Sequence, residues 1–437
     1  MATPGQTAAP IFHINLESLA LALAVLSATM ILAVPAAQAQ TFHVLHAFTG
    51  GADGSTPVGA GVTIDGAGNV YGGAAFGGLQ GSQCYESLTC GTIFKLRRHG
   101  SSWIFNLLYS FHGADGATPD APLAIASDGT LYGTTFYGGT GCFNGCGNVF
   151  RLQPPPTACA SFLCPWTQTV LYQFTGKADG SQPAFGPLSF DAAGNLYGTS
   201  TGNGTGTCGT VFELARNGDQ WTFNLLWGFT GYLDGCSPWS GVIFDQANNL
   251  YGATTSGGAN QAGTAFELVS YGRSWKLTPL HQFVRSSDGS GSFGNLTFDS
   301  SGDLFGTNEE GGPGDAGGVF ELSPYSGGWN FSVLHSFSGE SGPQAALLMD
   351  SAGNLYGTSV EGGKYGWGNV FKMTPSGSGY TYTDLYDFTG GSDGGQPLGQ
   401  IAMDTSGNLY GTAEFGGITG TDPCSTYGCG TVWEITP

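Results

Sequence analysis

Seven copies of one unit run through this chain, and the strands expected at its two ends predict how they close. Each unit contains a short run that ends in phenylalanine, at Phe48, Phe111, Phe174, Phe229, Phe283, Phe337 and Phe388. Repeats of about 51 to 63 residues that contain only short strand patterns are typical of a β-propeller. No segment after residue 40 has a helical period. We therefore expect an all-β fold.

Within a unit the sequence predicts four strands, named a to d in chain order. Strand a leads to the turn Asp-x-x-Gly-Asn, strand b reads Leu-Tyr-Gly-Thr, strand c reads Gly-Thr-Val-Phe-Glu-Leu, and strand d ends in Leu-Tyr-x-Phe. The last unit stops at its strand c, Gly430–Ile435, whereas residues 41–48 form a strand d before the first strand a. Pairing these two segments removes the open sheet edge. The prediction is a seven-bladed propeller of four-stranded antiparallel blades over residues 40–437, closed by strand 41–48.

Residues 1–39 are typical of a secretory signal peptide. An apolar stretch, Leu19 to Val34, precedes Ala37-Gln38-Ala39, which suits cleavage before Gln40. The segment before the apolar stretch contains no Lys or Arg, so the alternatives are a retained N-terminal anchor or a wrongly chosen start codon. We expect a secreted, periplasmic or cell-surface protein with no transmembrane span in its mature part, acting as a monomer.

The charge balance excludes some partners. The chain has 31 Asp plus Glu against 11 Lys plus Arg, a formal net charge of −20. Nucleic acids and anionic membranes bind through clustered positive charge, so neither is expected as a partner. Neutral polymers and cations fit an acidic surface better.

The ten cysteines all follow the signal segment and their spacing predicts five disulfides. An even number of cysteines in an exported chain favours disulfides over free thiols, and no His accompanies them at zinc-finger spacing. Three pairs flank b-to-c loops, one clips an insertion in the second unit, and one joins the third unit to the fourth. The predicted pairs are Cys84 with Cys90, Cys142 with Cys146, Cys424 with Cys429, Cys159 with Cys164, and Cys208 with Cys236.

Antiparallel strands place the d-to-a and b-to-c loops on one face of the ring. Six d-to-a loops contain Asp-Gly, at Asp53, Asp115, Asp179, Asp234, Asp288 and Asp393. A ring of carboxylates is a weak candidate for binding calcium, which prefers several oxygen ligands. The interpretation we favour is that each Asp caps its own turn, because no loop has the dense Asp spacing of a calcium motif. No other cofactor is predicted.

The b-to-c loops on the same face combine aromatic and acidic residues. Units seven, one and two contribute Phe415, Phe76, Phe136 and Tyr137, and units five to seven contribute Glu309, Glu310, Glu361 and Glu414. Aromatic rings stack on the apolar faces of sugars, and carboxylates accept hydrogen bonds from sugar hydroxyls. These eight residues are the predicted ligand-binding set. The alternative is that the rings pack between blades.

The sequence predicts no catalytic set. A glycosidase needs two carboxyl groups across a cleft, and Glu361 with Glu414 is the best pair that the sequence offers. The sequence contains no nucleophile elbow, zinc-protease motif or phosphate-binding loop.

The repeated residues, seen over Asp191–Leu214 and Asp404–Ile435, resemble the GloVer (Gloeo/Verruco) tandem repeat of bacterial exported proteins. The resemblance covers nearly all of residues 42–437. It implies export and a role at the cell surface or envelope, often with a separate C-terminal anchor, which is not expected here because the last strand leads directly to Pro437. The family carries no established reaction, and the fold alone does not determine function.

The sequence therefore predicts an exported module that binds extracellular carbohydrate or envelope components. One alternative is a polysaccharide-degrading hydrolase or lyase that uses carboxylates at the rim. Another is a protein–protein scaffold with no small ligand.

Overall fold

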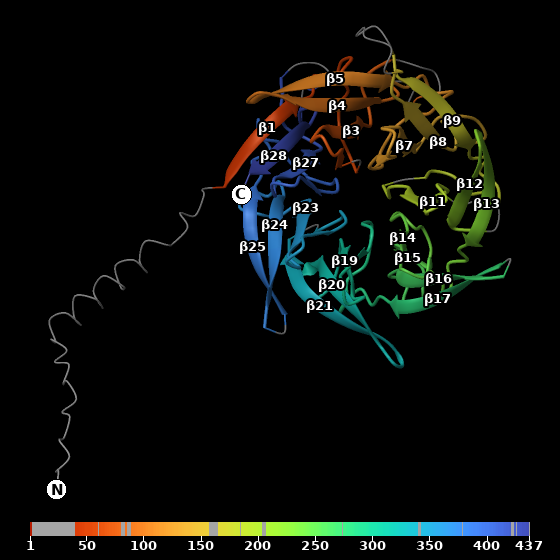
Figure 1. The fold of residues 1–437 in the computed structure, drawn as a ribbon, viewed down its shortest axis with the longest axis vertical. Helices are drawn as coiled ribbons and strands as arrows, with labels where there is room; N and C mark the ends of the chain where they lie inside the picture. Colours follow the sequence, from red (N-terminus) through yellow and green to blue (C-terminus); the bar gives the residue numbers. More distant parts are fainter. Residues whose placement is uncertain are drawn as a thin grey trace. The chain divides into compact units, whose positions relative to one another are not determined.

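Twenty-eight strands form seven antiparallel sheets of four within the residues that the computed structural model describes. These are Met1 and residues 40–436, apart from 60, 80–83, 85–88, 157–164, 184, 203–206, 273, 340–341, 378, 421–423 and 425. The sheets are the blades of a ring formed by Thr41–Thr436 (Figure 1). The predicted all-β seven-bladed propeller is confirmed.

Six blades are continuous in sequence, and their strands follow one another outward from the axis in the order a, b, c, d. Blade one comprises β2 (Val62–Ile64), β3 (Val70–Ala74), β4 (Thr92–His99) and β5 (Ser102–Ser110). Blade two comprises β6 (Ala124–Ile125), β7 (Leu131–Thr135), β8 (Asn148–Gln153) and β9 (Thr167–Gln173). Blade three comprises β10 (Ser189–Phe190), β11 (Leu196–Ser200), β12 (Thr210–Asn217) and β13 (Gln220–Gly228).

The next three blades repeat this order. Blade four comprises β14 (Ile243–Phe244), β15 (Leu250–Ala253), β16 (Thr264–Tyr271) and β17 (Ser274–Gln282). Blade five comprises β18 (Thr297–Phe298), β19 (Leu304–Asn308), β20 (Asp315–Tyr325) and β21 (Gly328–Ser338). Blade six comprises β22 (Leu348–Met349), β23 (Leu355–Ser359), β24 (Asn369–Ser376) and β25 (Gly379–Asp387).

Blade seven joins the two ends of the ring. It comprises β26 (Ala402–Met403), β27 (Leu409–Ala413) and β28 (Thr431–Thr436), with β1 (Thr41–Ala47) as its outer strand. Thr41 is paired with Thr436, and Phe42 of β1 stacks on Tyr386 of blade six with ring centroids 3.8 Å apart. The N-terminal strand therefore closes the ring as the sequence predicts, and it also contacts the neighbouring blade.

Packing between strands b and c explains the glycine of the Leu-Tyr-Gly pattern. In blade two, Gly133 of β7 is paired with Phe150 of β8, and a Cβ atom on Gly133 would lie 2.8 Å from the Phe150 ring. The ring occupies the space that a side chain would take. Phe150 is fully buried, as are the phenylalanines at the ends of most d strands, including Phe111 and Phe174. The core is thus a set of aromatic layers between blades.

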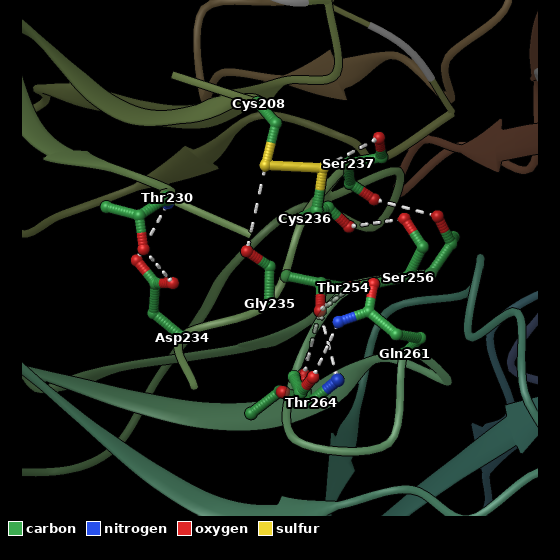
Figure 2. Close-up of a disulfide and its surroundings, with 12 residues drawn as sticks. Cys208, Thr230, Asp234, Gly235, Cys236, Ser237, Thr254, Ser256, Gln261 and Thr264 are labelled. Atoms are coloured by element: carbon green, nitrogen blue, oxygen red, sulfur yellow. Dashed lines mark hydrogen bonds between the residues drawn. A yellow bond between two sulfur atoms is a disulfide. The ribbon is translucent and has the colours of Figure 1, made fainter. Parts of the chain in front are cut away.

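Disulfides lie where neighbouring blades meet. The carbonyl groups of Cys90, Cys146, Cys208 and Cys429 each accept a hydrogen bond from the start of the following blade, with N···O distances of 2.7 to 2.9 Å. Four predicted pairs are bonded: Cys84–Cys90, Cys142–Cys146, Cys208–Cys236 and Cys424–Cys429. Figure 2 shows the Cys208–Cys236 bridge, which links blade three to the start of blade four beside the Thr230–Asp234 turn.

The fifth predicted disulfide concerns the insertion after strand c of blade two. Cys159 lies outside the described residues, and so does its predicted partner Cys164. Unlike the other four pairs, the bridge between Cys159 and Cys164 is therefore not confirmed, and it stays a prediction.

None of the described residues belongs to a helix of the length and apolar character needed to cross a membrane.

Candidate functional site

A ring of seven residues, one from each blade, surrounds the axis on the face of the d-to-a and b-to-c loops. Each lies three residues before the buried apolar residue that begins or precedes strand a, such as Leu123, Val242 or Leu296. We call this set the mouth ring; it consists of Gly59, Asp120, Phe185, Trp239, Phe293, Gln344 and Leu398. Five members, from blades one, three, five, six and seven, line one cavity of about 20 Å³. Because these blades lie on different sides of the ring, the cavity lies on its axis.

Backbone hydrogen bonds hold a second set of residues beside the mouth ring, namely the residues that follow strand b in each blade. After each strand b, one N–H group bonds to the carbonyl of the residue at which the chain turns into strand a. Phe136 thus bonds to Thr118, Glu309 to Gly291 and Glu414 to Gln396, with N···O distances of 2.9 to 3.2 Å. These turning residues have positive φ, 59° at Thr118 and 52° at Gln396. That backbone turn directs the following residues toward the axis.

Four aromatic rings from four blades meet at the mouth. The Trp239 ring centroid lies 5.0 Å from that of Phe185 and 5.6 Å from that of Phe293. Phe136 of blade two stacks on Trp239 of blade four, with centroids 5.8 Å apart and planes at 19°. All four side chains are partly exposed. They form a continuous aromatic surface, and each ring retains some contact with solvent.

Phe185 closes the channel below this surface. A Cβ atom on Gly59 would lie 1.8 Å from the Phe185 ring, so the ring reaches blade one from blade three. Nearer the hairpin face, strands a line a separate, open cavity of about 330 Å³ with residues such as Val62, Leu123 and Ile401. The mouth is therefore a shallow depression rather than an open tunnel.

Two carboxyl groups at the mouth have altered acidity. Asp120 is 8% exposed, and its Oδ1 atom is buried without a hydrogen-bond partner. Burial, together with repulsion from Glu414, raises the pKa of Asp120 to about 8. Burial raises the pKa of Glu414 to about 7. Glu414 therefore ionises first, and its charge then opposes ionisation of Asp120.

A third carboxylate, Glu309, accepts a hydrogen bond from the side-chain amide of Gln344. Its neighbour Glu310 instead forms an ion pair with Arg285, with an N···O distance of 2.6 Å. Successive residues of an extended chain point to opposite sides, which explains why the two glutamates have different surroundings.

The same alternation divides the eight residues predicted to bind ligand. Phe136, Glu309 and Glu414 lie with the mouth ring. Four others pair through the backbone with the d-to-a segment of their own blade; they are Phe76, Tyr137, Glu310 and Phe415. Tyr137 packs against the aromatic core around Phe111, and the Phe415 ring lies 5.6 Å from that of Tyr427. The eighth residue, Glu361, accepts a hydrogen bond at its carbonyl from Ser359.

The sequence interpretation missed all seven residues of the mouth ring, among them Asp120, Phe185, Trp239 and Phe293. Their fixed offset from the apolar residue of strand a is visible in the sequence. An alignment of the units on that residue would have placed them in one ring. The single-residue insertions before strand a in blades one and three hide the offset, because they shift Gly59 and Phe185 relative to the preceding Pro.

The six Asp-Gly aspartates bind to their own turns. Asp179 accepts hydrogen bonds from the Thr175 backbone and hydroxyl groups at 2.8 and 2.6 Å, and the hydroxyl of Tyr172 in strand d donates at 2.9 Å. Despite burial, these bonds hold the pKa of Asp179 below its usual range. Corresponding backbone contacts are made by Asp53, Asp115, Asp234, Asp288 and Asp393. In the described part of the chain, no group of three or more His, Cys, Asp or Glu side chains is placed to hold a metal ion.

These features define a seven-bladed β-propeller with an aromatic and acidic channel mouth. The chain belongs to the Gloeobacter/Verrucomicrobia repeat family, whose sequence pattern matches residues 161–347 and 327–437. The resemblance drawn from the repeated residues is therefore confirmed. No curated protein matches the chain.

Many solved structures share the fold. A fungal alcohol oxidase of the AA5 family, in complex with copper, is 12% identical, with 92% of this chain and 77% of that chain covered and a TM-score of 0.56. A protein from Bacteroides fragilis described as a candidate 6-phosphogluconolactonase is 14% identical, with 84% and 98% covered and a TM-score of 0.51. At such low identity the similarity shows the fold alone.

Proposed function

We propose that this propeller is an exported module that binds an extracellular carbohydrate at the mouth of its channel. The observation that carries the proposal is the meeting of Trp239 with three phenylalanine rings from other blades. Partly exposed rings stack on the apolar faces of pyranose sugars, and nearby carboxylates accept hydrogen bonds from their hydroxyl groups. The depression is shallow, so it suits a segment of a polymer lying across it better than an enclosed small molecule.

Export is part of the proposal. The predicted signal peptide over residues 1–39 supports it, as do the four disulfides of the described residues, because structural disulfides form in oxidising compartments. We propose a secreted, periplasmic or cell-surface location.

A second candidate function is polysaccharide cleavage. The pKa of about 7 at Glu414 suits a group that donates a proton near neutral pH, and Asp120 lies within electrostatic reach of it. Asp120 and Glu414 therefore replace the pair that the sequence offered, Glu361 and Glu414, as the best candidate pair of carboxyl groups. Soluble sugar released over time from a bound polysaccharide would favour this candidate.

The test is a binding screen of the exported protein against insoluble and soluble polysaccharides. We expect binding that is lost in Trp239→Ala and retained in Tyr271→Ala. Tyr271 is a suitable control because it is 79% exposed and lies at the end of β16, in the c-to-d hairpin on the opposite face. Equal binding by both variants would contradict a site at the mouth. If the wild-type protein bound no polysaccharide and co-purified with envelope proteins, the scaffold alternative would replace the proposal.

A further inference from the structure

Two carboxyl groups at the channel mouth, Asp120 and Glu414, have no cationic partner among the described residues. The ion pairs of that part of the chain join His46 to Asp53, Arg98 to Glu434, His112 to Asp115, His281 to Asp288 and Arg285 to Glu310. Ionising a buried carboxyl group without a counter-charge is costly, and ionising two that repel each other costs more. A positive charge supplied by a ligand would reduce both the cost of burial and the repulsion between the two groups.

The surroundings of these carboxyl groups also suit a cation. Asp120 is more than nine-tenths buried, and its Oδ1 atom lacks a hydrogen-bond partner, so one strong acceptor is left for a donor that the protein does not provide. Phe136 of the same blade and Trp239 present aromatic faces at the mouth. The faces of aromatic rings carry partial negative charge and attract ammonium groups. Carboxylates and aromatic faces together are the usual means of binding an amine.

The apolar surface of the mouth restricts the kind of molecule to which the amine is attached. The Phe185 ring reaches across to Gly59 and narrows the channel, which favours a ligand that lies at the mouth over one that passes through it. Four aromatic rings suit a flat, extended apolar surface such as the face of a pyranose. An amine attached to a sugar ring would satisfy both requirements: the ring would stack on the aromatic surface, and the ammonium group would pair with the carboxyl groups.

We infer that the ligand is a polysaccharide with free amino groups, of the type of β-1,4-linked glucosamine, whose ammonium groups pair with Asp120 and Glu414 while its rings stack on Trp239. This inference rests on the proposed carbohydrate-binding function and names its substrate class. The strongly negative net charge of −20 would further attract such a polymer.

The test compares three hexasaccharides that differ only at carbon 2 of each ring. Cellohexaose carries a hydroxyl group there, the N-acetylglucosamine hexamer a neutral amide and the glucosamine hexamer an amine. We expect the glucosamine hexamer to bind at least about tenfold more tightly than the other two, as hydrogen bonds between charged partners allow. Calorimetric titration at about 0.15 M salt limits non-specific attraction between the acidic protein and the cationic sugar.

Two isosteric variants and a control assign the effect to the mouth. Glu414→Gln and Asp120→Asn should each weaken binding of the glucosamine hexamer by about tenfold and weaken binding of cellohexaose by clearly less, so that the preference for the amine falls. Asp219→Asn, in the exposed c-to-d turn of blade three on the opposite face, makes the same carboxyl-to-amide change and should alter binding of neither hexamer. An equal loss in Asp219→Asn would overturn the inference, since bulk charge would then explain the preference.

The inference and the proposed function can fail separately. Binding of cellohexaose or the N-acetylglucosamine hexamer as tight as that of the glucosamine hexamer would overturn the amine inference and leave carbohydrate binding in place. No binding of any hexamer, or of any polysaccharide in the wider screen, would overturn both.

Discussion

At the scale of single residues, the mouth concentrates groups that weaken the fold. Asp120 is buried and Glu414 is half-buried within electrostatic reach of it, whereas aspartates in the loops around them are bound by their own turns. Burying carboxyl groups without partners lowers the stability of a protein, and such groups are common at binding sites. The energetic cost at the mouth is therefore itself an argument for a ligand.

We expect the free energy of unfolding to fall as the pH rises from about 4 to about 8. The pKa of Asp120 is about 8 in the folded protein against an ordinary value of 3.8, so between these pH values the folded state holds a proton that the unfolded state has lost. Each unit of difference corresponds to about 1.4 kcal/mol. Asp120→Asn should flatten this decline. Melting temperatures at pH 5, 7 and 9 measure it, with Asp219→Asn as control; parallel curves for wild type and Asp120→Asn would contradict the burial of this charge.

At the scale of elements, β1 carries the closure of the ring. Its backbone pairs with β28 from Thr41 to Ala47, and Phe42 adds a stacked contact with blade six. Without it, β28 would expose an unpaired edge and the aromatic layer behind it would face water.

Deletion of residues 41–48 should lower the melting temperature sharply or cause aggregation. A chain that begins at residue 40 is the matched control. Thermal unfolding followed by circular dichroism measures both. If the shortened protein melted with the control, the closing role of β1 would be wrong.

The disulfides should differ in how much they add to the free energy of unfolding. Cys208–Cys236 spans 28 residues and joins two blades, whereas Cys142–Cys146 spans 4. Chain-entropy estimates give about 3 to 4 kcal/mol for the longer loop and about 2 kcal/mol for the shorter. We therefore expect the Cys208→Ser, Cys236→Ser double variant to lose more stability in urea than Cys142→Ser, Cys146→Ser. The reverse order would show that the inter-blade bridge adds little constraint.

The elements were predictable from the sequence because their signals are repeated and local. The glycine that packs against Phe150 and the turn aspartates recur at fixed places in the units. The last unit lacks a strand d, and this absence stands out against the repeated pattern. The mouth was harder to predict. Whether Tyr137 or Phe136 faces the axis depends on which side of a short extended segment points inward, and Trp239 meets Phe136 only because the ring brings blades two and four together. Local patterns do not contain that information.

At the scale of the whole molecule, the closed ring brings residues from distant repeats to one axis. Phe136 and Phe293 are far apart in sequence, yet both rings contact Trp239. The mouth-ring position and the position after strand b carry different residues in different units, and these residues set the chemistry of the mouth. The strand patterns of the blades are kept. This separation of frame and site is why the fold of related structures does not reveal the ligand.

The most direct test of the account is a crystal structure of the protein with an oligosaccharide selected by the binding screen. The account predicts a sugar ring stacked on Trp239 or Phe136, with heavy atoms within about 4.5 Å, and a donor from the ligand at Asp120 or Glu414. A ligand bound to the hairpin face or to the outer strands, with the mouth unchanged, would contradict it.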